Sequence, residues 1–241
     1  MNECRKANRH TGKWIRKILE FKRGLGLVPI VLISMLNGAS FDFPPHLLPD
    51  PYPKVYETID LLPFNSHGWN THAEIFEKMF QENEIKNIIE VGSWLGCSTR
   101  LFAQSIPKNG KVFAIDHWLG SKEHFESDEF KDWIPILYQQ FLSNVIHTEL
   151  TDKIIPVRLR SLEAAKRLQN IAIPIDLIYI DASHEYADVY ADLCAWYPYV
   201  ENHGILCGDD WNVGDVQRAV TRFAQENQLI IYQIDGFWRL F

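Results

Sequence analysis

The stretch NIIEVGSWLGCST, residues 87–99, has the pattern of a buried strand that turns sharply into a helix. Gly92 and Gly96 frame the turn, and glycine is used where the backbone bends or approaches another group closely. The GxxxG spacing differs from the GxGxxG of dinucleotide sites and from the nucleoside-triphosphate loop. We therefore expect a strand–turn–helix unit without a phosphate-binding loop, in which the glycines serve either a ligand or close packing between helix and sheet.

Strand and helix patterns alternate on both sides of this unit. Strands are expected at 86–91, 111–115, 153–159, 175–180, 204–208, 229–234 and 237–240, and helices at 71–83, 98–105, 162–168, 186–197 and 216–226. The long segment 117–150 is expected to be largely helical from about Phe125. This alternation predicts an α/β fold, a Rossmann-like, doubly wound and mostly parallel sheet of seven strands. The Asp235-Gly236 turn predicts an antiparallel last strand.

Charge is unevenly distributed along the 241 residues. Residues 1–24 carry a net charge of +6, whereas the whole chain carries −7, so the remainder is strongly acidic. An acidic body argues against nucleic acid as its main partner. Residues 1–53 are expected to be a basic and apolar extension with a Pro-rich linker at 41–53, followed by one domain over 54–241.

The apolar run Leu25 to Leu36 has 12 residues, too few to span a bilayer. Together with its basic flank it suggests a signal peptide, an interfacial anchor with weak membrane association through residues 1–40, or an arm packed on the domain. A cytoplasmic location is favoured by the cofactor inferred below. Homo-oligomerisation is left open.

Polar residues follow two expected strands at the point where each strand ends. Asp181-Ala-Ser-His184 follows 175–180, and Asp209-Asp210-Trp211 follows 204–208. Parallel strands present their carboxyl ends at one edge of the sheet, where ligands of such folds bind. Three carboxylates with an imidazole suggest a hard-metal site with a base beside it. Helix N-capping is the simpler explanation for one Asp in each turn.

A further acid, Asp116, ends the second strand, and an acid at this place can accept hydrogen bonds from both hydroxyls of a ribose. With the Gly turn and Glu90, it indicates an adenosine-type ligand without a pyrophosphate. The segment resembles the cofactor-binding half of a class I S-adenosylmethionine-dependent methyltransferase. The resemblance implies that the cofactor contacts a set of residues drawn from four strand ends: Glu90, Gly92, Ser93, Gly96, Ser98, Asp116, His117, Trp118, Ser161 and Asp181.

The two strand-end motifs, over roughly 85–211, resemble the metal-dependent sugar O-methyltransferases of the macrocin and mycinamicin type and the cephalosporin-hydroxylase-like group. This resemblance implies Mg²⁺ held by Asp181, Asp209 and Asp210, with His184 as the catalytic base and Asp181 also catalytic. The expected reaction is O-methylation of a small molecule or sugar. Rivals are a metal-independent methyltransferase, a non-catalytic membrane-associated cofactor-binding protein and a nicotinamide-dependent oxidoreductase.

Several residues allow two interpretations. Ser161 is either an adenine contact or a helix N-cap. Trp69 is either a wall over the cofactor or substrate, or part of a helix start capped by Asn70 or Thr71. Trp211 stacks on a ring of the substrate or packs between helix and sheet. In the 117–150 segment, His117 and Trp118 are the better candidates for a pocket, whereas Tyr138, Phe141 and Val145 are expected in the core.

Overall fold

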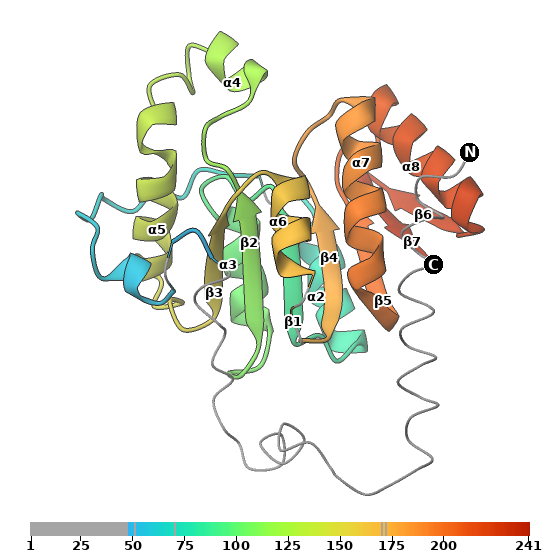
Figure 1. Ribbon diagram of the computed structural model, residues 1–241, viewed down its shortest axis with the longest axis horizontal. Helices are drawn as coiled ribbons and strands as arrows, with labels where there is room; N and C mark the ends of the chain where they lie inside the picture. The colour runs from blue at the N-terminus through green and yellow to red at the C-terminus, as the bar shows by residue number, and fades with distance from the viewer. Residues whose placement is uncertain (1–47, 51, 70, 170, 172) are drawn as a thin grey trace, which may run out of the picture. The chain divides into compact units, whose positions relative to one another are not determined.

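The computed structural model describes residues 48–50, 52–69, 71–169, 171 and 173–241. A seven-stranded sheet with the order β3-β2-β1-β4-β5-β7-β6 forms its centre (Figure 1). The strands are β1 (Asn87–Val91), β2 (Lys111–Asp116), β3 (Ile154–Arg158), β4 (Ile175–Ile180), β5 (Val200–Gly208), β6 (Ile231–Ile234) and β7 (Phe237–Leu240). β1 to β5 are parallel, and β7 is antiparallel to both β5 and β6. The predicted Rossmann-like sheet with an antiparallel last strand is confirmed.

Helices cover both faces of the sheet, as the alternating pattern predicts. α2 (Ala73–Glu82), α3 (Cys97–Ser105) and α5 (Leu137–His147) share a hydrophobic core with one face of the sheet. α6 (Ser161–Leu168) and α7 (Tyr186–Trp196) lie on the other face, and α8 (Gly214–Asn227) packs against α7 (Figure 1). The strand ends that carry the candidate site residues therefore lie at one edge, between two helical layers.

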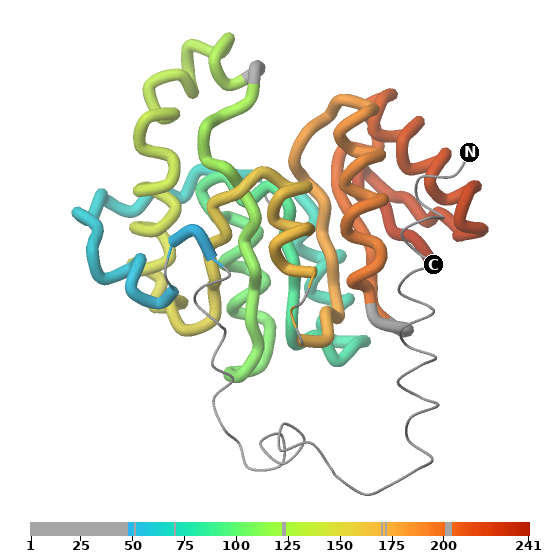
Figure 2. The backbone as a smooth tube through the Cα atoms, viewed as in Figure 1, coloured from blue at the N-terminus to red at the C-terminus, as the bar shows by residue number. Residues whose placement is uncertain are grey.

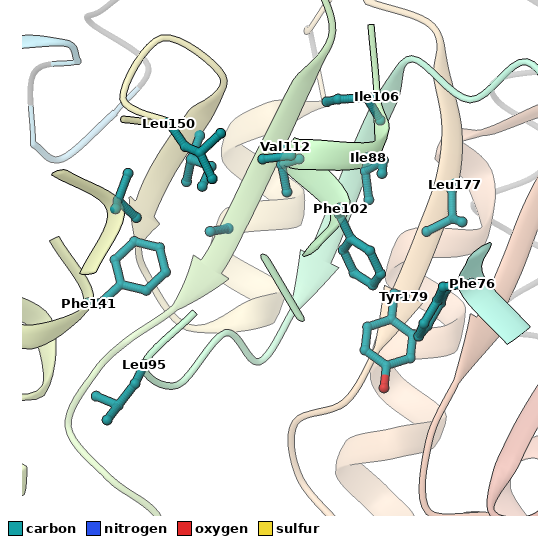
Figure 3. Close-up of a cluster of buried hydrophobic side chains, with 14 of the residues drawn as sticks. Phe76, Ile88, Leu95, Phe102, Ile106, Val112, Phe141, Leu150, Leu177 and Tyr179 are labelled. Carbon is teal, nitrogen blue, oxygen red and sulfur yellow. The ribbon is translucent and has the colours of Figure 1, made fainter. Parts of the chain in front are cut away.

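The core under α2 and α3 holds one residue of the candidate site in place. Alternate strand residues such as Ile88 and Leu177 are fully buried there against the aromatic side chains of the helices (Figure 3). The ring of Phe76 lies 4.7 Å from that of Phe102 and 5.2 Å from that of Tyr179, both edge to face. Tyr179 is thus fixed by its ring, and its hydroxyl is free to point toward the end of β4.

The segment after β2 is less helical than expected. Only α4 (Lys122–Glu126), the 3₁₀ turn η6 (Ile134–Ile136) and α5 are helical, with turns between Ser127 and Trp133. Pro135 lies at the start of η6 and lacks the N–H that a continuous helix would need there. Figure 2 shows that the segment rises beyond the edge of the sheet before α5 returns along it.

The described part of the Pro-rich segment packs on the domain, where an extended linker was expected. Leu48 is buried, and the hydroxyl of Tyr52 lies 3.1 Å from the carbonyl oxygens of Thr151 and Asp152. The next turn, η5 (Lys54–Tyr56), places the Tyr56 hydroxyl 2.9 Å from the carbonyl oxygen of Ile154. The predictions for residues 1–47 lie outside the described residues. Within the described ranges, no helix is both long enough and apolar enough to cross a membrane.

Candidate active site

Both glycines of the turn after β1 are required by packing. Gly92 has φ +93°, and a Cβ atom there would lie 1.9 Å from the carbonyl oxygen of Asp181. Gly96 has φ +81°, and a Cβ atom would lie 2.9 Å from the Phe141 ring. Side chains are excluded at both positions by sterics and by the left-handed backbone. The turn is therefore pressed directly against the end of β4, where the acidic residues begin.

Glu90 and Ser98, both predicted to contact the cofactor, bind one another beneath the turn. Glu90 is fully buried, and its carboxyl accepts hydrogen bonds from the hydroxyls of Ser98, at 2.5 Å, and Thr99. Burial raises the pKa of Glu90 to about 7, although the hydroxyl hydrogen bonds favour the charged form. This pair ties the end of β1 to the first turn of α3 and so fixes the shape of the Gly turn.

Asp116 closes the other side of the turn. Its Oδ2 accepts hydrogen bonds from the backbone N–H groups of Ser93, at 3.1 Å, and Trp94, at 3.0 Å. Its Oδ1 accepts one from the N–H of Trp118 at 2.7 Å. A carboxylate has about four acceptor positions, so these three bonds leave one for a ligand. The structure therefore offers room for one ribose hydroxyl at Asp116 and not for the two that the sequence suggested.

Two of the expected adenine contacts are engaged elsewhere. Trp118 is buried, with its ring 4.8 Å from Tyr138 and 4.7 Å from Phe141, so it belongs to the core and cannot flank an adenine. The Ser161 hydroxyl donates to Asp192 at 2.5 Å and accepts from the indole N–H of Trp196 at 2.8 Å.

The capping role considered for Ser161 is also wrong, because Arg160 is the N-cap residue of α6. The expectation for the long segment is confirmed, since Phe141 and Val145 are buried and Tyr138 packs against that core. His117 remains partly exposed beside the turn, with Nδ1 4.0 Å from Asp116 Oδ1.

The residues expected after β4 and β5 do come together. A small pocket at the carboxyl ends of these strands is lined by Asp181, His184, Asp209 and Asp210, with apolar Val189 and Trp238 closing one side. Burial, together with the nearby charges of Asp209 and Asp210, raises the pKa of Asp181 to about 8. Burial is the larger cause, and the charges add to it because the carboxylates lie close together.

His184, the predicted base, pairs with one of the predicted metal ligands, Asp210. Its Nε2 lies 2.8 Å from Asp210 Oδ2, and each side chain keeps about a third of its surface exposed, at 35% and 33%. Asp210 has φ +61°, a left-handed conformation that costs a residue with a Cβ about 1 kcal/mol. In this strained conformation the Asp210 carboxylate points toward His184.

Two further residues of this cluster escaped the sequence analysis. The Tyr179 hydroxyl lies 3.3 Å from Asp181 Oδ2 and 3.4 Å from Asp209 Oδ2, so its proton can be donated to either carboxylate. His72, the N-cap residue of α2, places Nε2 2.7 Å from Asp209 Oδ1. Burial alone would raise the pKa of Asp209, but the hydrogen bonds from His72 and from the N–H of Asp210 hold it below its usual value.

The carboxylates as arranged do not form a metal-binding group. The carboxylate oxygens of Asp209 are hydrogen-bonded to His72, to the Tyr179 hydroxyl and to the backbone N–H of Asp210. The carboxylate of Asp210 pairs with His184. No set of three His, Cys, Asp or Glu side chains among the described residues could hold a metal ion. The three predicted ligands therefore line one pocket without forming a metal-binding group as they stand in the described part of the chain.

Aromatic side chains gather over the Gly turn. We call His67, Trp69, Trp94, Phe130 and Trp133 the aromatic cluster, in which His67 is in edge contact with all four others. Trp69 is 56% exposed. The N-cap expected at Asn70 or Thr71 is corrected, because His72 holds that position and makes no side-chain capping bond. Trp211 is partly buried, and its N–H donates to the carbonyl oxygen of Gly236 at 2.8 Å.

The fold is shared with solved O-methyltransferase structures. The enzyme from Bacillus cereus, in complex with SAH, is 17% identical, with 78% of this chain and 87% of that chain covered and a TM-score of 0.53. TomG from Streptomyces achromogenes, in complex with SAM, is 14% identical over 74% and 82%, with a TM-score of 0.55. CalS11, a TDP-rhamnose 3′-O-methyltransferase of calicheamicin biosynthesis, is 16% identical over 70% and 76%, with a TM-score of 0.50.

Sequence comparison identifies the family. No curated protein matches the chain. A family model described as a methyltransferase domain matches residues 89–211, which is just over half of the chain and includes the Gly turn, Asp116 and the acidic cluster. The chain therefore belongs to this methyltransferase family, and its fold is that of the class I S-adenosylmethionine-dependent enzymes.

Proposed function

We propose that the chain transfers a methyl group from S-adenosylmethionine to a hydroxyl of a small molecule or sugar. The observation that carries this proposal is the placement of His184 and three carboxylates beside the Gly turn. Gly92 touches Asp181, so the expected donor side and the polar cluster adjoin without an intervening layer. Donor and acceptor must meet within about 3–3.5 Å for an in-line displacement, and this juxtaposition supports placing both at the end of β4.

The cofactor would lie over the turn between β1 and β4. The strand order reverses at this point of the sheet, and open α/β sheets bind their ligands in the resulting crevice. The remaining acceptor position of Asp116 suits a ribose hydroxyl, and the complexes of the Bacillus cereus enzyme with SAH and of TomG with SAM support this class of cofactor. S-adenosylmethionine, when bound, supplies an electrophilic methyl group on a sulfonium.

His184 is the proposed general base. A hydroxyl must lose its proton as the oxygen attacks, and a positioned imidazole can take it. Asp210, 2.8 Å from Nε2, would orient the ring and stabilise the imidazolium that forms. A hydroxyl placed in the pocket lies among carboxylates that disfavour other anions, which favours a neutral acceptor such as a sugar. The sugar substrate in the printed description of CalS11 supports this choice.

Mg²⁺ assistance is the finer version of the proposal and comes from the resemblance to sugar O-methyltransferases. It requires Asp209 and Asp210 to leave their histidine partners. The metal-independent rival is favoured by those same two pairs, because each His side chain already occupies a carboxylate oxygen that a cation would otherwise bind. The two versions differ in whether Mg²⁺ binds the protein together with its cofactor.

Calorimetry with S-adenosylhomocysteine tests the cofactor first. We expect binding in the micromolar range, and an Asp116→Ala variant should weaken it tenfold or more. NADH is the matched competitor for the oxidoreductase alternative. Binding of NADH without any binding of S-adenosylhomocysteine would refute the proposed function.

Turnover then tests the base and the metal. Release of S-adenosylhomocysteine is followed with a panel of phenols and glycosides, with and without EDTA. His184→Ala should reduce kcat by about 10²-fold or more and leave S-adenosylhomocysteine affinity unchanged. A loss of turnover with EDTA that Mg²⁺ restores supports the metal-assisted version. Turnover that is indifferent to EDTA supports the metal-independent one.

A further inference from the structure

The segment 62–69, which precedes α2, is anchored at three positions. The N–H of Leu62 donates to the Ser143 hydroxyl at 3.0 Å, and the N–H of Asn65 donates to Asn144 Oδ1 at 2.9 Å. Gly68 has φ +150°, and a Cβ atom there would lie 2.5 Å from the Cβ of Cys97. These contacts fix the loop to α5 and to the first residue of α3. Trp69 is therefore presented by a fixed piece of backbone.

Trp69 nevertheless leaves more than half of its surface open, at 56% exposure. Its ring lies 5.0 Å from His67 and 6.0 Å from Phe130, both edge to face, and 6.3 Å from Trp94. Neighbouring rings hold it in one orientation without covering it. The exposed face of the ring is available to a ligand, and binding residues are often carried by loops that a rigid scaffold positions.

The position of Trp69 ties it to both halves of the candidate active site. On one side, Trp94 belongs to the Gly turn, and its indole N–H donates to His67 Nδ1 at 3.3 Å. On the other side, His72 follows three residues after Trp69 and bonds Asp209 at 2.7 Å. The loop thus runs from the expected cofactor site to the acidic cluster, with Trp69 between the two anchors.

The backbone of Trp94 supports the same conclusion. Trp94 has φ +45°, its N–H is held by Asp116 at 3.0 Å, and its carbonyl oxygen accepts the indole N–H of Trp118 at 2.7 Å. His124 stacks on its ring with centroids 4.2 Å apart. A strained backbone that is held by several partners is characteristic of functional positions. Here it directs an indole into the aromatic cluster beside Trp69.

We propose that Trp69 is a specificity-determining residue that stacks on the ring carrying the acceptor hydroxyl. The inference rests on the proposed function and adds the acceptor chemistry, namely a six-membered ring with an apolar face. Both a phenol and a pyranose sugar have such a face. Stacking on an indole would hold the ring at the mouth of the site while its hydroxyl reaches His184.

The test uses the full chain saturated with S-adenosylhomocysteine and two probes, catechol and methyl α-rhamnopyranoside. Dissociation constants are measured by ligand-observed NMR titration. We expect Trp69→Ala to weaken the preferred probe about fivefold to tenfold, and Trp69→Phe to restore most of the affinity. Tyr232→Ala is the matched control, because Tyr232 is an aromatic residue with 48% exposure on β6, the edge strand of the sheet, and outside the aromatic cluster. Tyr232→Ala should leave the dissociation constants of both probes unchanged. The probe that responds identifies the phenol or the sugar as the ring.

Three results would overturn the inference. The first is an unchanged affinity for both probes in Trp69→Ala. The second is a parallel loss of S-adenosylhomocysteine affinity in that variant, which would assign Trp69 to the cofactor. The third is no binding of either probe to the wild type at millimolar concentration. Failure of the wild type to bind S-adenosylhomocysteine refutes the proposed function itself, so the two failures are distinguishable.

Discussion

His72 Nε2 lies 2.7 Å from Asp209 Oδ1, although the two residues are 137 positions apart in the chain. The imidazole is buried in the folded domain, and its ring is in edge contact with Phe237 at 5.7 Å. This pair joins α2 to the end of β5. It also relieves the crowding of negative charge, because Asp209 is near Asp181 and shares the Tyr179 hydroxyl with it.

His72→Ala should lower the free energy of unfolding by about 2 kcal/mol at pH 7, because the partly buried Asp209 carboxylate loses its hydrogen bond to the imidazole. The depressed pKa of Asp209 means that this pair stabilises the fold above about pH 4, the ordinary Asp value. The stabilisation fades as the pH falls below that value. Urea denaturation at pH 7 and pH 3.5 measures the difference. His147→Ala, which removes an exposed imidazole bonded to the Leu62 carbonyl oxygen, should cost less than 1 kcal/mol. Equal losses in the two variants would contradict the prediction.

Gly92→Ala should destabilise the fold by about 3 kcal/mol or more, because the new methyl group would overlap the Asp181 carbonyl oxygen and φ is +93°. Gly214→Ala is the matched substitution. Gly214 begins α8 and has no atom within 4 Å of the added Cβ, so stability should rise by up to about 1 kcal/mol. Thermal melting should show a lower Tm than the wild type for Gly92→Ala and an unchanged or higher Tm for Gly214→Ala. Equal changes in the two variants would contradict the close contact at Gly92.

Glu90→Gln should reduce the pH dependence of stability. The folded pKa of Glu90 is raised to about 7, above the unfolded value, so the wild type is favoured at low pH and loses stability as the pH rises from about 4.5 through 7. A shift of that size corresponds to about 3 kcal/mol at most. Denaturation at pH 5 and pH 8.5 should show a smaller difference in the variant. Glu77→Gln is the control, because Glu77 is exposed, and this variant should keep the pH dependence of stability of the wild type. A slope in Glu90→Gln equal to that of the wild type would refute the assignment.

Ser161→Ala should affect stability and not the cofactor. Its hydroxyl serves Asp192 and Trp196, and burial has raised the pKa of Asp192 to about 6. Loss of the hydrogen bond leaves that carboxyl without its donor and should cost about 1–2 kcal/mol at pH 7. The dissociation constant for S-adenosylhomocysteine should change less than twofold. A tenfold loss of affinity would restore Ser161 as an adenine contact.

Local pattern was enough to predict the elements of this fold. Strand β4 was predicted with its observed bounds, because an apolar run closed by Asp181 marks both the strand and its end. The grouping of Asp181, Asp209, Asp210 and His184 also followed, since parallel strands bring their carboxyl ends to one edge. The helical content of 127–133 was overestimated, because Pro135 restarts the helix in a way that apolar spacing does not reveal.

The partners of each side chain were decided by tertiary structure. Trp118 and Ser161 follow strand ends as predicted. Packing nevertheless buries the Trp118 ring in the core, and the Ser161 hydroxyl is hydrogen-bonded to Asp192. His72 could not be found from the sequence, because a lone imidazole before a helix carries no signal of the carboxylate it will meet. Sequence determined the α/β topology and which polar residues share an edge, since both depend on short-range periodicity. Which lone pairs remain free for a ligand depends on contacts between distant segments, and only the folded chain decides them.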